Sequence, residues 1–297
     1  MKRFALLLPI LALAAAPARA EDPATNAPAA VRRGVFFFPD GIAVFRGGLQ
    51  AASNSTYSVQ GAVLGFADVP RRMDGVQLDL FAAGAECVNG IQIGLGAVGA
   101  AGSARGLVAG GMVAAADDMV GIEVAGIFGI AKRLRGVQLA MMFGFAGGVG
   151  ERLKPLSPEE IERDVPVSWG AMGAFFSTSS VRFRGVQAAV GASASEDMAG
   201  LLVGGLGTRA GRLRGVQAGL VFDDADSLEG LQIGLVTCAG RANGVQFGGI
   251  NTADELHGLQ VGVYNRARGG AGVQIGLVNG FGPPGDALWL PIVNAHF

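Results

Sequence analysis

Hydrophobic and polar positions alternate along most of the chain in short, strand-like stretches. In one typical stretch, the aliphatic residues Leu231 and Ile233 flank Gln232, and Gly234 follows. Alternation with a period of two is typical of a β-strand whose two faces meet different surroundings. Each stretch therefore predicts a strand with one aliphatic face and one face of small or neutral polar side chains.

This stretch is a repeat, and each copy opens with a glycine. The opening glycines lie 14 to 16 residues apart, except for one gap of 34 residues between Gly136 and Gly170. Nine of the thirteen copies continue with an aliphatic residue and a glutamine, and the others carry Val108, Glu123, Met172 or Leu202 at the third position. A fixed period of this length is typical of repeat architectures, and the long gap indicates one period of 15 residues plus an insertion of 19. The opening glycines are Gly75, Gly90, Gly106, Gly121, Gly136, Gly170, Gly185, Gly200, Gly215, Gly230, Gly244, Gly258 and Gly272.

Charged residues are rare in the predicted strands and gather between them. In the first eight residues of all thirteen copies, only Asp79 and Glu123 are charged. The intervening segments alternate in sign: Asp197 precedes one glycine, Arg212 and Arg214 precede the next, and acidic residues precede the one after. The full unit is therefore a pair of repeats, about 30 residues long.

We predict an all-β fold, an antiparallel transmembrane β-barrel of about sixteen strands built from the 14–16-residue repeats. A strand of about ten residues spans about 24 Å when tilted near 45°, which matches the apolar band of an outer-membrane barrel. Successive turns then lie at opposite rims, so acidic turns gather at one rim and basic turns at the other. The aliphatic face meets lipid, and the small polar face lines a lumen.

The alternative fold is a parallel left-handed β-roll, or solenoid, in which each repeat forms one complete coil. Glutamines at the third position then stack as a ladder, and the alternating charges form ladders of opposite sign down one edge. Stretches such as residues 121–130 and 136–145 favour the barrel, because they are apolar on both faces. A thin roll in water leaves the outer apolar face uncovered.

Tandem units of the type Gly-Leu-Gln-Ile-Gly-Leu-Val-Asn occur at residues 230–237, 258–265 and 272–279, and the chain closes with residues 290–297. These units and this ending resemble a family of exported bacterial "surface repeat-containing" proteins. The resemblance covers about residues 75–297. It implies a location at the cell surface or in the envelope, and no established activity.

The N-terminal residues predict export. Residues 1–20 have a basic start at Lys2 and Arg3, an apolar stretch, and an Ala-Arg-Ala cleavage motif, which together indicate a signal peptide. Residues 21–33 are expected to be a disordered Pro/Ala-rich tail. Residues 34–297 then form a single repeat-built β domain, with an inserted loop at about residues 151–167.

The insertion differs in character from the repeats. A capping serine, a proline and two glutamates at residues 157–160 predict a short helix. Its acidic surface is either a receptor-contacting or pore-constricting loop or a solvated decoration, because long loops often carry function. The candidate loop residues are Ser157, Glu159, Glu160, Glu162 and Asp164.

Composition excludes several kinds of function. The 23 basic and 24 acidic residues leave no basic surface for nucleic acid. Two cysteines and two histidines are too few for a disulfide scaffold or a multi-ligand zinc site. In a barrel, Asp79 and Glu123 lie on the lumen side and are candidates for tuning ion selectivity. No base, nucleophile or positioned histidine accompanies them, so we predict no enzyme, no catalytic residue, no metal and no cofactor.

The sequence predicts an outer-membrane surface repeat protein that is a passive pore or a structural envelope component, with the lipid bilayer as its partner. The alternative function is a surface-exposed β-roll that serves adhesion or interaction. Both hypotheses place the protein outside the cytoplasm, in the outer membrane or at the cell surface, and both leave its protein partners open.

Overall fold

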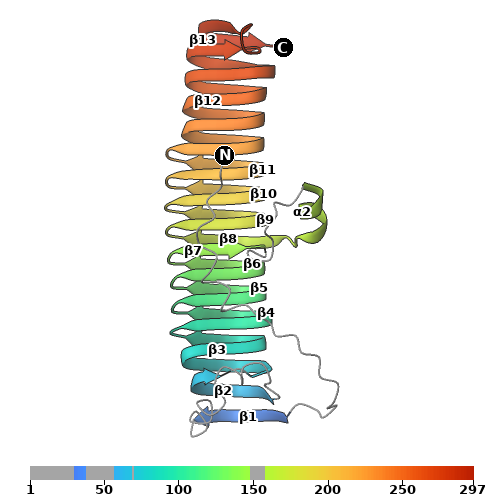
Figure 1. Cartoon of the computed structure of the whole chain (residues 1–297), viewed down its shortest axis with the longest axis vertical. Coiled ribbons are helices and arrows are strands. Elements are labelled where there is room, and N and C mark those ends of the chain that lie inside the picture. The colour runs from blue at the N-terminus through green and yellow to red at the C-terminus, as the bar shows by residue number, and fades with distance from the viewer. Residues whose placement is uncertain (1–29, 38–56, 69, 148–157) are drawn as a thin grey trace.

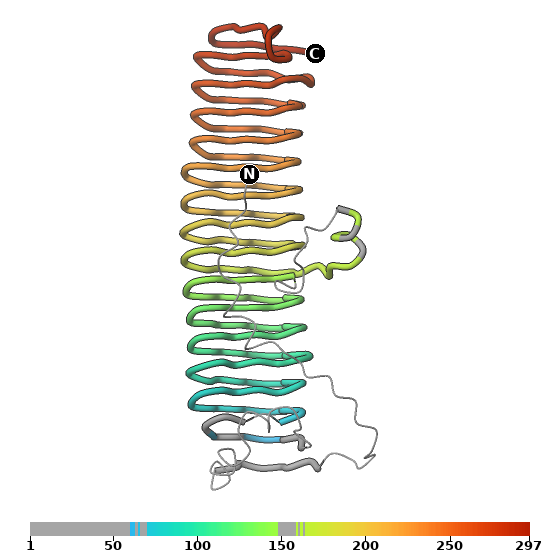
Figure 2. The backbone as a smooth tube through the Cα atoms, viewed as in Figure 1, coloured from blue at the N-terminus to red at the C-terminus, as the bar shows by residue number. Residues whose placement is uncertain are grey.

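The chain winds into a parallel β-solenoid whose coils stack along a straight axis (Figures 1 and 2). The computed structural model describes residues 30–37, 57–68, 70–147 and 158–297. The predicted signal peptide and residues 21–29 of the predicted tail lie outside the described residues, whereas residues 30–33 belong to the first strand. The described elements are β1 (Ala30–Phe37), β2 (Tyr57–Asp68), β3 (Arg72–Gly94), β4 (Ala97–Gly110), β5 (Val113–Ala125), β6 (Phe128–Ala140), β7 (Phe143–Ala146), α2 (Pro158–Asp164), β8 (Ser168–Ala174), β9 (Ser177–Ala189), β10 (Ala192–Gly204), β11 (Gly207–Gly219), β12 (Phe222–Phe281) and β13 (Leu288–His296).

The direction of the strands corrects the predicted fold class. Neighbouring strands from β1 to β12 pair in parallel; in β9, β10 and β11, for example, Gly185, Gly200 and Gly215 lie side by side. Within the described residues, only β13 runs antiparallel, along the end of β12. The predicted antiparallel barrel is therefore wrong, and the alternative, the parallel solenoid, is the observed fold.

The opening glycine of each repeat explains why one repeat closes a coil. Gly215 has a φ of 133°, and a methyl group there would overlap the carbonyl oxygen of Gly200 on the preceding coil. Only glycine adopts such a φ without strain, so the chain can turn a corner at this position. The repeat consequently bends back within about 15 residues instead of running straight through a bilayer.

Glutamines form a ladder through the interior of the solenoid. Gln246, Gln260 and Gln274 each donate from Nε2 to the glutamine of the preceding coil, at 2.7–2.8 Å. All three side chains are fully buried. A buried amide needs a hydrogen-bond partner, and the next coil supplies one at the same depth. The stacked glutamines expected for a solenoid are thus confirmed.

A second polar ladder runs beside the first in the C-terminal coils. The Asn251 side chain accepts from Thr237 at 2.6 Å and donates to Asn265 at 2.7 Å, and Asn265 donates to Asn279 at 2.7 Å. Apolar side chains fill the rest of the core beside these ladders. The largest of them are Met73, Met119, Leu134, Met172, Phe183, Met198, Leu202, Leu213, Leu228 and Leu256.

The long gap in the repeat lies inside a single coil. β7 and β8 both pair with β6 on one side and β9 on the other, so together they make one coil that the insertion interrupts. Gly136 pairs with Gly170, and Gly170 with Gly185, as in uninterrupted coils. The helix α2 belongs to this insertion and projects sideways from the stack (Figure 1).

Candidate interaction surfaces

The solenoid presents one long aliphatic face to the outside. In each coil the second and fourth residues of the repeat point outward, whereas the third and fifth point inward. From Val76 to Ile275, no outward position of these two columns carries a polar side chain. Ile122, Leu139 and Phe247 on this face are 47%, 50% and 55% exposed. We call these two outward columns the aliphatic face.

An apolar edge continues the aliphatic face around the next corner of the coil. It consists of the sixth and seventh residues of the repeat, where aromatic rings also stack: the rings of Phe175 and Phe176 meet edge-on at 5.2 Å, and Phe176 lies 6.0 Å from Phe143. The exposed large side chains of this edge are Leu80, Phe81, Leu95, Met112, Met141, Phe175, Phe176, Val190, Leu206, Leu220, Val221, Leu235, Ile250, Val263, Leu277 and Val278.

The segment before each opening glycine carries the charged residues, and these pair between neighbouring coils. Examples are Arg214 with Glu229 at 3.2 Å and Arg241 with Glu255 at 2.9 Å, partners that lie one coil apart in sequence. Opposite charges therefore alternate along the axis on this charged side. The prediction that acidic turns gather at one rim and basic turns at the other is therefore wrong. The alternation instead lets acidic and basic side chains of neighbouring coils form ion pairs.

The ion pairs between neighbouring coils form a charge ladder, and Asp197 is the residue at which its strength can be measured, because Asp197 contacts arginines on both neighbouring coils. Its Oδ2 lies 3.6 Å from Nε of Arg182 and 3.5 Å from Nη2 of Arg212. We expect Asp197→Asn to lower the free energy of unfolding by about 1 kcal/mol, since partly exposed pairs contribute about 0.2–1 kcal/mol each. Urea denaturation at low and high salt measures this loss, which should shrink as salt screens the charges.

The matched control for this experiment is Asp286→Asn, in the loop before β13 and outside the ladder. It should leave the denaturation midpoint unchanged. A loss that is equally large in high salt, or equally large in the control, contradicts an electrostatic role for Asp197.

The inserted helix is confirmed, and it is anchored on the charged side. The Arg182 Nη1 donates to the backbone carbonyls of Glu162 and Val165 at 2.9 and 3.1 Å, and Ile161 and Val165 are buried. Ser157 lies outside the described residues. Of the other predicted loop residues, Glu159, Glu162 and Asp164 are exposed, and Glu160 lies within α2. The acidic side chains of this helix therefore project from the side of the solenoid, whereas the barrel prediction placed them on a rim.

Asp79 and Glu123 share the inner face, as predicted, but that face encloses a packed core. Asp79 is 5% exposed and accepts from Gln77 Nε2 at 2.7 Å; Glu123 is fully buried and accepts from Gln138 Nε2 at 2.9 Å. The two carboxylates lie in different coils and are not brought together. The predicted lumen is therefore wrong for the described coils, and with it the passive pore and the tuning of ion selectivity.

Burial changes the protonation of Glu123. Removal of the carboxylate from water raises its pKa to about 7, and hydrogen bonds from Gln138 and from the Ile130 backbone offset only part of this effect. The register shows why the site is weakly compensated: Glu123 pairs with Val108 on one neighbouring coil, where the ladder has an aliphatic residue, and with Gln138 on the other.

Asp223 is a buried carboxylate that sequence reasoning missed. The sequence groups it with Asp224 and Asp226 as an acidic turn, yet its side chain is fully buried between Thr208 and the backbone N–H of Gly219. Burial raises its pKa, and both hydrogen bonds oppose the rise. The available signal was positional, since Asp223 lies one repeat before Thr237 of the inner polar ladder.

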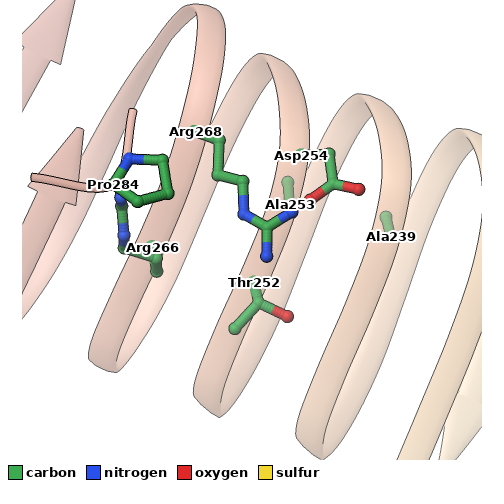
Figure 3. A pocket seen from close by; sticks show the side chains of 7 residues that line it. All are labelled: Ala239, Thr252, Ala253, Asp254, Arg266, Arg268 and Pro284. Carbon is green, nitrogen blue, oxygen red and sulfur yellow. Dashed lines mark ion pairs between the residues drawn. The ribbon is translucent and has the colours of Figure 1, made fainter. Parts of the chain in front are cut away.

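A hollow of about 380 Å³ opens on the charged side near the C-terminal end (Figure 3). Its charged groups are already paired: Arg268 Nη1 lies 2.9 Å from Asp254 Oδ1, and the Arg266 guanidinium lies 5.4 Å from the ring centre of Trp289. The hollow therefore offers no uncommitted acid, base or nucleophile. It is lined by Ala239, Thr252, Ala253, Asp254, Arg266, Arg268 and Pro284.

Other chemistry-bearing residues are scattered in the part of the chain that the structure describes. Cys87 and Cys238 are free and half-buried, and no group of three or more histidine, cysteine or acidic residues there could hold a metal ion. None of the described helices is long and apolar enough to span a membrane. Comparisons of the chain with protein-family models, with curated proteins and with solved structures gave no match.

Proposed function

We propose that this protein is an exported structural or adhesive β-roll, exposed at the cell surface and without chemistry of its own. The observation that carries the proposal is the unbroken aliphatic face, which runs along the outside of the rod. Contiguous apolar surface of this extent on a protein exterior is typical of a contact surface. Parallel coils with laddered side chains supply the stiff scaffold that such a surface needs.

Three further features support this function. Many of the exposed charges in the described coils form ion pairs between neighbouring coils, as Arg214 does with Glu229, so these charges stabilise the solenoid itself. The predicted signal peptide favours export, and the resemblance to exported surface repeat proteins points to the envelope. The pairing of Arg268 with Asp254 in the hollow near the C-terminal end favours contact over catalysis.

The first experiment locates the protein and asks what its aliphatic face does there. An antibody raised against the purified chain should bind intact cells of the producing organism. Cells that carry Ile233→Gln together with Phe247→Gln should attach to an apolar surface such as polystyrene several-fold less than wild-type cells. These two side chains point outward, so glutamine replaces apolar contact without creating a cavity in the core.

The matched control is Arg214→Gln together with Glu229→Gln, which introduces the same number of glutamines on the charged side. These cells should attach like the wild type, and surface antibody binding should be equal for all three chains. Antibody binding that requires cell lysis, or equal attachment by both variants, contradicts the proposed function.

A further inference from the structure

The aliphatic face is long, narrow and without charge. Adjacent strands lie about 4.8 Å apart, so the thirteen coils from Gly75 to Gly272 extend the face over about 58 Å. Together with the sixth-residue column of the adjoining apolar edge, the two columns of the face make a strip about 15 Å wide. The face thus has an area of about 900 Å², which exceeds the largest apolar patches of typical monomers, at about 300–600 Å².

On this basis, which rests on the proposed function, we infer that the occupant of the aliphatic face is a second copy of the same chain. Two such faces in contact bury about 1,700 Å² in total, which is the size of a standard stable interface. A second copy also shares the spacing of the coils. Rows of side chains at equal intervals interdigitate along the whole length when two sheets pack about 10 Å apart.

The side-chain sizes select the direction of the second copy. The largest side chain of the fourth-residue column is Phe247. It lies four coils after Ala188, toward the C-terminus. Ala109 stands four coils from Ala188 on the other side. A two-fold axis along the strand at Ala188 places each Phe247 opposite the partner's Ala109, and the interface is then isologous.

The same axis matches two further pairs of large and small residues. It places Leu139 opposite Ala218 and Val203 opposite Gly173 in the partner copy. A parallel arrangement instead puts Phe247 against Phe247 and leaves the small residues facing one another. At these three pairs the antiparallel dimer sets a large side chain against a small one, whereas pairs nearer the ends, such as Leu78 with Ile275, bring two branched side chains together.

Charge disfavours a lipid surface as the occupant. Basic side chains beside an apolar strip help a protein to bind anionic membranes. Most arginines of the described coils instead lie on the charged side in ion pairs with acids, as Arg209 does with Asp224. A dimer through the aliphatic face leaves both charged sides, and both α2 helices, directed outward. The same face then binds either the second copy or an external apolar surface, so attachment of cells to polystyrene requires the dimer to open.

The test measures the mass of the purified mature chain in detergent-free buffer by light scattering and sedimentation across the micromolar range. We expect twice the mass of one chain. Ala188→Arg together with Val203→Arg places charge at the centre of the face and should give one chain mass with an unchanged circular dichroism spectrum. The control, Arg214→Gln together with Glu229→Gln, should remain dimeric.

A spin label at Asn243 measures the register, in a chain whose native cysteines are changed by Cys87→Ser and Cys238→Ser. The antiparallel dimer separates the two labels by eight coils along the axis, which with the width of the dimer gives about 46 Å, whereas a parallel dimer brings them to about 25 Å. This distance is read from the folded dimer, so it stands even if the arginine variant does not fold.

A monomeric wild-type chain overturns the inference, and so does an arginine variant that folds and keeps the dimer mass. A chain that is monomeric and floats with phosphatidylcholine vesicles identifies lipid as the occupant instead. Each of these results leaves the proposed function standing as long as the intact-cell antibody and attachment experiments succeed, so the two failures are distinguishable.

Discussion

Gly215→Ala is expected to prevent the solenoid from folding at 37 °C, because the side chain has no room at the corner of the coil. The φ of 133° at Gly215 is strained for any residue with a Cβ, and the added methyl group overlaps the carbonyl oxygen of Gly200. Strained backbone alone costs about 1–3 kcal/mol, and here a clash with a backbone atom that cannot rotate away is added. We expect a loss of at least about 3 kcal/mol.

Soluble yield, circular dichroism and the urea midpoint measure this effect. The matched control is Gly269→Ala, where the nearest atom to an added methyl group is the Asp254 carbonyl oxygen at 3.9 Å. That variant should fold with a midpoint close to the wild type. If Gly215→Ala and Gly269→Ala share one midpoint, the stacked glycines do not determine the coil.

Glu123→Gln is expected to stabilise the protein at pH 8 by about 3 kcal/mol. The pKa of Glu123 is about 7 in the fold and 4.5 for an unperturbed glutamate, so the folded state holds a proton that the unfolded state has lost. Stability from this group is fully present below about pH 4.5 and is lost as pH rises through 7. Each pKa unit corresponds to about 1.4 kcal/mol.

Glutamine removes that dependence and supplies a neutral side chain like those of the ladder. Thermal or urea unfolding between pH 5 and 8 should therefore show a wild-type stability that declines more steeply with pH than that of the variant. Glu229→Gln, which removes an exposed carboxylate of the charged side, should keep the wild-type slope. An unchanged slope in Glu123→Gln means that the carboxylate is not protonated in the fold.

The repeat itself was predictable from the sequence. The spacing of the glycines, the separation of Gln232 from Leu231 and Ile233 onto opposite faces, and the short helix of the insertion are all confirmed. These features follow from local periodicity, which has the same form in a barrel strand and in a solenoid coil. The ladder of alternating charges was also expected for the solenoid, and Arg214 and Glu229 confirm it.

The direction of the strands was not predictable from that periodicity. It depends on whether a glycine such as Gly215 turns a corner or continues a strand, and a glycine residue in a sequence is compatible with both. Because the outer face of the predicted strands is apolar, the sequence then favoured a membrane, where lipid contacts that face. The same missing information placed Glu123 in a hydrated lumen, although the glutamine that follows one coil later shows that the column is an interior ladder.

The coil formed by β7 and β8 admits a long excursion of the chain without any shift of the coils on either side. In such a molecule the number of coils sets the length of the solenoid. The inserted segment, which leaves the solenoid at a single coil, independently sets what projects from its side. New binding elements can therefore be added by lengthening this one segment while the solenoid keeps its geometry.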